Sequence, residues 1–179
     1  MPTDIVPDDK DWTWVLQRPC DECGFDARSI ERGDVGAMIL DNAEQWRRLL
    51  DASDASVRVR PRPNCWSTLE YGAHVRDVYR LYEHRLRLML DTHDPVYPNW
   101  DQDETAIAER YDQQDPGIVA DELVAAATIL AASFNAVSGD DWQRKGRRSD
   151  GARFTVESFA RYLVHDPFHH LWDVRVAPA

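Results

Sequence analysis

The chain has 179 residues, a length typical of a single domain with a sizeable hydrophobic core. Its residues are 43% hydrophobic and 30% charged, which is typical of a soluble globular protein. The formal net charge of −11 argues against a general nucleic-acid binder, because contacts to phosphates need clustered Lys and Arg. We find no apolar run of membrane-spanning length and no signal peptide in the opening residues MPTDIVPDDKDW. We therefore expect a cytoplasmic protein with no nucleic-acid partner and no membrane partner.

Helical periodicity predicts four long amphipathic helices. Each predicted helix has apolar residues three and four positions apart, with charged residues between them. Ser67 and Glu70 form a capping box at the start of the second helix, and Thr155 is the expected N-cap of the last. The predicted helices cover residues 34–50, 67–91, 116–137 and 155–174, and a short helix is expected over residues 104–111.

The segments between these helices show no convincing strand pattern. The basic cluster at 144–148 lies in a polar segment and is expected to be a solvated loop that could steer an anionic substrate. Residues up to Pro7 look disordered, and the rest of 1–33 reads as an irregular N-terminal arm containing a CxxC pair. The sequence therefore predicts an all-α protein with a four-helix bundle over residues 34–179.

The most informative motif is HDPFHH near the C-terminus. His165 and His169 are four residues apart, so on a helix their imidazoles lie on one face and can share a divalent metal. His74 lies on the inward face of the second predicted helix and is a third candidate ligand. Three protein ligands leave coordination positions open, which is typical of a catalytic metal. Spacing alone also allows ordinary core histidines. His170 points about 100° away from His169 and is expected to be surface or to support the site.

Three further features bear on this site. Pro167 removes a backbone donor between the paired histidines, so a kink is expected there. Asp77 and Asp173 could accept hydrogen bonds from ligand imidazoles, although ordinary surface carboxylates are the simpler interpretation. His84 and His93 have no partner at a useful spacing and are expected to be solvated.

The three cysteines argue against a disulfide framework, because their number is odd and the expected compartment is reducing. Cys20 and Cys23 have the spacing of half a zinc site, and Cys65 is one possible additional ligand. No fourth ligand is evident from the sequence. We therefore expect the CxxC pair to be two partly buried thiols that bracket a turn outside the catalytic centre.

The chain resembles the DinB/YfiT-like superfamily, which includes mycothiol-dependent maleylpyruvate isomerase and the bacillithiol and mycothiol S-transferases. The resemblance covers roughly residues 34–176. It is carried by Trp66-Ser67, by His74, and by His165-x-x-x-His169-His170-x-x-Asp173-Val174.

The resemblance implies an up-and-down four-helix bundle with a long crossover, often assembled as a homodimer. It also implies zinc or nickel bound by His74, His165 and His169, although some relatives have a carboxylate at the first position of the C-terminal pair. Pro167 departs from the family pattern, because many relatives have a freely helical residue there.

Two functions remain open from the sequence. The first is a metal-dependent enzyme acting on a small molecule: a low-molecular-weight-thiol S-transferase or isomerase using mycothiol or bacillithiol, or a hydrolase using water. The second is a non-catalytic metal-binding stress or regulatory protein, which a fourth protein ligand such as Asp77 or Cys65 would favour. Arg76 or Arg85 would bind an anionic substrate unless they form ordinary salt bridges. Tyr71 and residues 99–101 are candidates for the pocket mouth.

Overall fold

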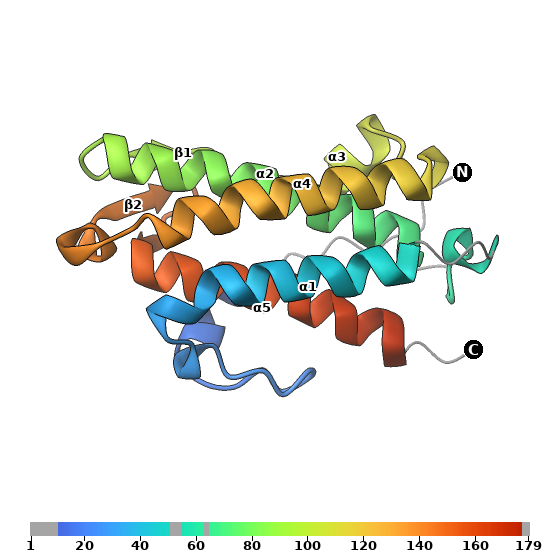
Figure 1. Cartoon of the computed structure of the whole chain (residues 1–179), viewed down its shortest axis with the longest axis horizontal. Helices are drawn as coiled ribbons and strands as arrows, with labels where there is room; N and C mark the ends of the chain where they lie inside the picture. The colour runs from blue at the N-terminus through green and yellow to red at the C-terminus, as the bar shows by residue number, and fades with distance from the viewer. Residues whose placement is uncertain (1–10, 51–54, 63–64, 177–179) are drawn as a thin grey trace.

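The computed structural model describes residues 11–50, 55–62 and 65–176 and has four long helices (Figure 1). Each lies within about two residues of its predicted bounds. Ser67 Oγ accepts a hydrogen bond from the backbone N–H of Glu70, which completes the predicted capping box, and Thr155 Oγ1 accepts from the backbone N–H of Ser158. The predicted disorder of the first seven residues lies outside the described part. The four helices are α1 (Val35–Leu50), α2 (Thr68–Asp91), α4 (Pro116–Asn135) and α5 (Val156–Val176).

The four helices pack side by side as a bundle, which confirms the predicted fold class. α1 and α5 run in one direction, and α2 and α4 run in the other (Figure 1). α1 and α2 each contact both α4 and α5. The long connection after α2 contains the short helix α3 (Gln102–Ala108) and returns the chain to the far end of the bundle. This crossover makes α2 and α4 parallel neighbours.

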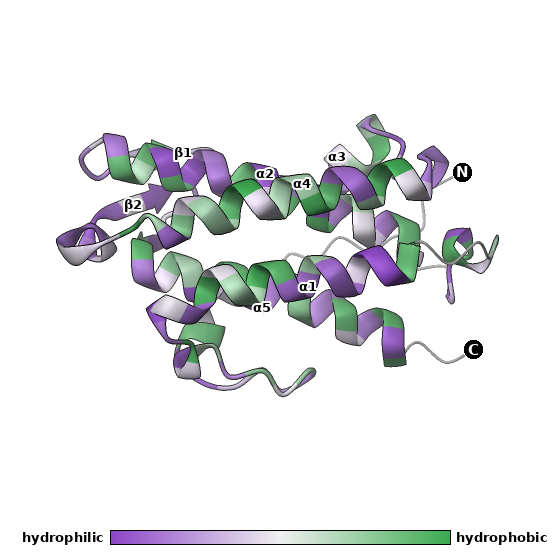
Figure 2. Cartoon of the chain, in the orientation of Figure 1, coloured by the Kyte–Doolittle hydropathy of each residue, from purple (hydrophilic) through white to green (hydrophobic). Residues whose placement is uncertain are grey.

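The core is built from the apolar stripes of the helices, with Trp46, Leu86, Leu123 and Phe159 among its buried side chains. Green hydrophobic residues run along much of α4 in Figure 2. This helix is long and apolar enough to match a membrane span by length and composition, contrary to the expectation that no such run exists. Its buried face contacts α1 and α2, as expected for a core helix of a bundle.

A small three-stranded sheet lies at one end of the bundle, where the sequence showed no strand pattern. β1 (Val96–Tyr97) pairs in parallel with β2 (Lys145–Arg148), which pairs in antiparallel with β3 (Arg153–Thr155). The basic cluster is therefore not a solvated loop. Gly146 within it is buried, and a Cβ there would lie 2.7 Å from Cγ of Met89, so the strand approaches α2 closely.

The arm is irregular, as predicted, and packs on α5. It contains three short 3₁₀ segments, Trp12–Leu16, Ala27–Ser29 and Arg32–Asp34. Both Trp12–Leu16 and Ala27–Ser29 contact α5, and Val15 and Cys20 are buried. The arm therefore covers a face of α5 that the other three helices leave open.

Candidate metal sites on two faces of helix α5

Helix α5 carries two pairs of potential ligands, offset by one residue. His165 and His169 form one pair with a spacing of four, and Asp166 and His170 form the other. Neighbouring positions differ by about 100° around a helix, so the two pairs face different surroundings. α5 remains helical through Pro167.

The first group joins α5 to α2 and contains His74, Asp166 and His170, which we call the bundle cluster. Its three ligand atoms all lie within 4.8 Å of one another. Nε2 of His74 lies 3.5 Å from Oδ1 of Asp166, and Nε2 of His170 lies 3.8 Å from the same oxygen. His74 is fully buried, whereas the Asp166 side chain is about one-third exposed (34%). The cluster thus has an inner imidazole and an outer carboxylate.

The bundle cluster contains buried polar atoms without hydrogen bonds. In the described part of the chain, neither ring nitrogen of His74 nor Oδ1 of Asp166 has a hydrogen-bond partner. An unsatisfied buried polar group costs about 1–3 kcal/mol. Two ligand atoms about 2.0–2.1 Å from one tetrahedral zinc lie about 3.4 Å apart, close to the His74–Asp166 separation. These residues therefore fit a divalent metal.

Aromatic rings surround the bundle cluster. The Trp100 ring stacks on His74, with centroids 5.3 Å apart and an interplanar angle of 7°. Trp66 lies 5.4 Å from His74, and Tyr71 lies 4.8 Å from His170. Tyr71 and Trp100 thus lie beside the cluster, and their place at a pocket mouth stays a prediction.

Asp173 orients His170. Its Oδ2 lies at a hydrogen-bonding distance of 2.8 Å from Nδ1 of His170, which leaves Nε2 directed toward Asp166. Carboxylates commonly hold metal-ligating imidazoles in this way. Asp173 therefore has the geometry of a supporting carboxylate, and the imidazole that it contacts is that of His170.

Burial favours the neutral form of the three predicted ligands, His74, His165 and His169. It lowers the pKa of His74 and His169, and, together with the charge of His169, lowers the pKa of His165 to about 4. Neutral imidazole is the form that binds metal. All three predicted ligands are therefore in the competent state near pH 7.

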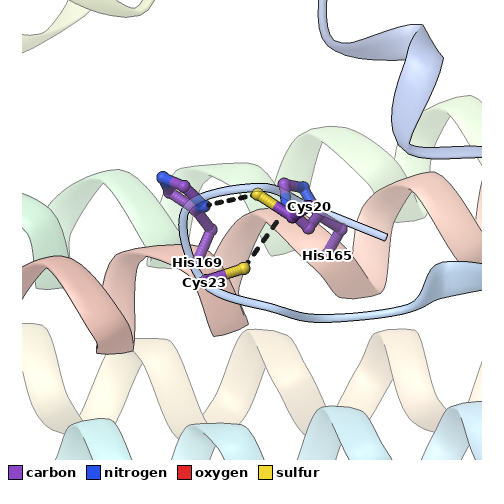
Figure 3. Close-up of side chains that lie close together, drawn as sticks. All are labelled: Cys20, Cys23, His165 and His169. Carbon is purple, nitrogen blue, oxygen red and sulfur yellow. Dashed lines mark hydrogen bonds between the residues drawn. The ribbon is translucent and has the colours of Figure 1, made fainter. Parts of the chain in front are cut away.

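The second group, which we call the arm cluster, joins α5 to the N-terminal arm. Figure 3 shows Cys20 and Cys23 on the arm facing His165 and His169 on α5. Cys20 Sγ lies 3.6 Å from Nδ1 of His169, and Cys23 Sγ lies 3.7 Å from Nε2 of His165. The four ligand atoms all lie within 4.8 Å of one another.

The structure therefore divides the predicted triad between two clusters. His74 groups with Asp166 and His170, whereas His165 and His169 group with the cysteines. Asp166 was missed, although its spacing of four from His170 was visible in HDPFHH. His170, which we expected to be surface or to support the site, lies among the potential ligands themselves, because α5 turns this residue toward α2.

We expected the CxxC pair to lie outside the catalytic centre, and the structure places it against α5. Cys20 and Cys23 contact the two histidines that we expected to bind the catalytic metal. The pair is distant from α5 in sequence, so periodicity gave no sign of this contact. Packing of the arm on α5 brings them together.

The other candidate ligands and substrate contacts have partners elsewhere. Arg76 forms ion pairs with Asp77 and Glu122, so Asp77 does not close the bundle cluster. Arg85 is buried and donates a hydrogen bond to the carbonyl oxygen of Pro98. Cys65 Sγ lies 3.8 Å from the Tyr71 hydroxyl.

His84 and His93 are exposed, as predicted for histidines without a partner.

Comparisons with known proteins agree with this architecture. The solved structure of YfiT from Bacillus subtilis, described as a probable metal-dependent hydrolase with an unusual four-helix bundle topology, matches with a TM-score of 0.75. The match covers 89% of this chain and 90% of the YfiT chain, at 15% sequence identity. No curated protein matches the sequence. The family model of the DinB superfamily matches residues 39–174, most of the chain, and the protein belongs to this superfamily.

Proposed function

We propose that this protein is a metal-dependent enzyme in which His74, Asp166 and His170 hold a divalent metal, zinc or nickel. The unsatisfied buried atoms of His74 and Asp166 carry this proposal, because a metal would satisfy them together. The description of YfiT as a probable metal-dependent hydrolase supports it. Two imidazoles and one carboxylate form the ligand set of several catalytic zinc sites.

The surrounding residues would prepare the site for chemistry. Asp173 fixes the ring of His170, and Trp66 and Trp100 shield the inner face of His74 from water. A divalent metal in such a site lowers the pKa of bound water or thiol toward neutrality. The exposed part of Asp166 marks the side from which a small substrate would approach.

Two activities follow from the choice of nucleophile. Water as the nucleophile would make the protein a hydrolase, as in the description of YfiT, and we favour this activity. A low-molecular-weight thiol such as mycothiol or bacillithiol would make it an S-transferase or isomerase. The competing function is a non-catalytic metal-binding stress or regulatory protein.

The test begins with metal loading of the purified protein and continues with activity screens. Zn²⁺ and Ni²⁺ are added to metal-free protein, and hydrolysis of ester and amide substrates is compared with consumption of mycothiol and bacillithiol. His74→Ala and Asp166→Ala should remove the activity while the circular dichroism spectrum stays helical. Full activity in folded His74→Ala would refute the catalytic metal. Metal binding without turnover in either screen would favour the non-catalytic function.

A further inference from the structure

The arm presents its two thiols through a tight turn. The backbone N–H of Cys20 donates to the carbonyl oxygen of Phe25, and that of Gly24 donates to the carbonyl oxygen of Cys20, both at 2.9 Å. Gly24 has a φ of 74°, a left-handed conformation that glycine adopts without steric cost. The turn closes directly after Cys23 and brings both sulfur atoms toward α5 (Figure 3).

Helix α5 supplies two imidazoles on the facing side. His165 and His169 are one turn apart and are only 3% and 6% exposed. Each imidazole meets a different thiol, so four donors come from two rigid backbone elements. Cys20 and both imidazoles are buried and Cys23 is half-buried, and such a gathering of polar or ionisable groups needs a chemical reason.

The spacing of these atoms matches a tetrahedral zinc ion. With Zn–S of about 2.3 Å and Zn–N of about 2.0–2.1 Å, tetrahedral angles place sulfur and nitrogen about 3.5 Å apart. The two sulfur–nitrogen separations here are 3.6 and 3.7 Å. Separate thiol–imidazole hydrogen bonds would explain each pair alone, but they do not require all four donors to converge.

The charge of a metal complex also suits this buried position. Two thiolates and two neutral imidazoles around Zn²⁺ give a complex of zero net charge, and the two thiol protons leave to solvent. Trp12 packs against both imidazoles, with centroids 5.0 Å from His169 and 5.6 Å from His165. A neutral complex under this ring avoids the cost of an unpaired buried charge.

Glu22 supports the same arrangement. Its Oε2 lies 3.5 Å from Nε2 of His169, the ring nitrogen opposite the one that faces Cys20. A carboxylate on the outer nitrogen fixes the ring and raises the basicity of the ligand. Glu22 belongs to the CxxC turn itself, so the turn supplies both the thiols and this carboxylate.

We propose that Cys20, Cys23, His165 and His169 form a second, structural zinc site that fastens the N-terminal arm to α5. Thiolate and imidazole donors together select zinc among the common divalent ions. Four protein ligands leave no open position, so this metal stabilises structure and does not activate substrate. The site is separate from the bundle cluster and does not depend on its catalytic role.

The decisive experiment measures zinc protection of individual cysteines in the wild-type chain. Metal-free, reduced protein is alkylated with and without Zn²⁺, and the modified cysteines are identified by mass spectrometry. Zinc should slow alkylation of Cys20 and Cys23 at least 10-fold and leave Cys65 unchanged as an internal control. Equal alkylation of Cys20 and Cys23 with and without Zn²⁺ would overturn the proposal.

Variants then separate the two metal sites. The double variant Cys20→Ser/Cys23→Ser should lose one zinc per chain, and its Co²⁺ form should lose the thiolate-to-cobalt absorption. The control Cys65→Ser should keep that zinc and that absorption. His74→Ala should keep the thiolate-to-cobalt absorption even if the catalytic metal is lost. Undiminished zinc in the folded double variant would refute the structural site. So would a Cys20–Cys23 disulfide, without zinc protection, in the wild-type chain prepared under reducing conditions.

Discussion

The two clusters share α5 but differ in their donor sets and in their surroundings. The bundle cluster has three donors, two imidazoles and a carboxylate, and one side of it reaches solvent through Asp166. The arm cluster has four donors, two of them thiols, and is covered by Trp12. An incomplete donor set suits chemistry, and a complete one suits structural support. A one-residue shift along a helix is therefore enough to direct two pairs of potential ligands to different partners.

One carboxylate lies between the clusters. Asp173 contacts His170 through Oδ2 at 2.8 Å, and its Oδ1 lies 3.8 Å from Nε2 of His169. The first contact is a hydrogen bond and the second is longer, so Asp173 supports the bundle cluster more directly. Substitutions on the two faces should therefore differ in kind as well as in size.

The largest expected difference is between His170→Ala and His169→Ala. Removal of a ligand should exceed the 10–100-fold loss typical of supporting residues, so His170→Ala should lower activity by at least about 100-fold. His169→Ala should keep most of the activity and lose the arm-cluster metal instead. Steady-state rates and metal content of both variants check this, with the exposed His84→Ala as control. A greater loss of activity in folded His169→Ala would reverse our assignment of the two faces.

A smaller effect is expected for Asp173→Asn. The amide keeps the size of the side chain but loses its charge, so it holds His170 less well. The bundle-cluster metal should bind about 10–100-fold more weakly, as is usual when a supporting carboxylate is changed. Competitive chelator titration measures this affinity, and the thiolate-to-cobalt absorption of the arm cluster should remain. An unchanged affinity would show that the 2.8 Å contact does not orient the ligand.

Acid should destabilise the metal-free chain through the histidines of α5. Burial and the charge of His169 lower the pKa of His165 from 6.5 to about 4 in the folded chain. As the pH falls, the His165 imidazole is therefore protonated in the unfolded chain before it is protonated in the folded chain. Stability is therefore lost between these two values, on the order of 2 kcal/mol for this group. Urea unfolding with a chelator, at several pH values across this window, measures the loss. His165→Gln should flatten the dependence, and an equally steep curve would exclude His165 as its source.

The smallest expected effect is that of Ser67→Ala at the start of α2. The substitution removes the hydroxyl that accepts from the backbone N–H of Glu70, at a cost of about 1 kcal/mol in the free energy of unfolding. His74 lies two turns further on, so metal binding in both clusters should persist. Thermal unfolding measures the loss of stability, and metal content shows whether both clusters still bind metal. Loss of the bundle-cluster metal would show that the cap also positions His74.

The helices of this protein could be predicted from its sequence because their signals are local. The apolar stripe of each helix and the caps at Ser67 and Thr155 depend only on neighbouring residues, and the structure places them as expected. The strands escaped prediction because β1 has two residues and β3 has three, too short for an alternating pattern. The pairing of β1 with β2 joins segments on either side of α4.

The sequence by itself determined that α5 carries potential ligands four residues apart and that His74 faces inward. Only the tertiary structure decided which pair meets His74, because HDPFHH contains two such pairs and the rotation of α5 depends on what packs against it. α2 lies on the side of Asp166 and His170, and the arm lies on the side of His165 and His169. The CxxC turn is 142 residues from His165 along the chain, and a contact at that distance is set by packing rather than by local pattern.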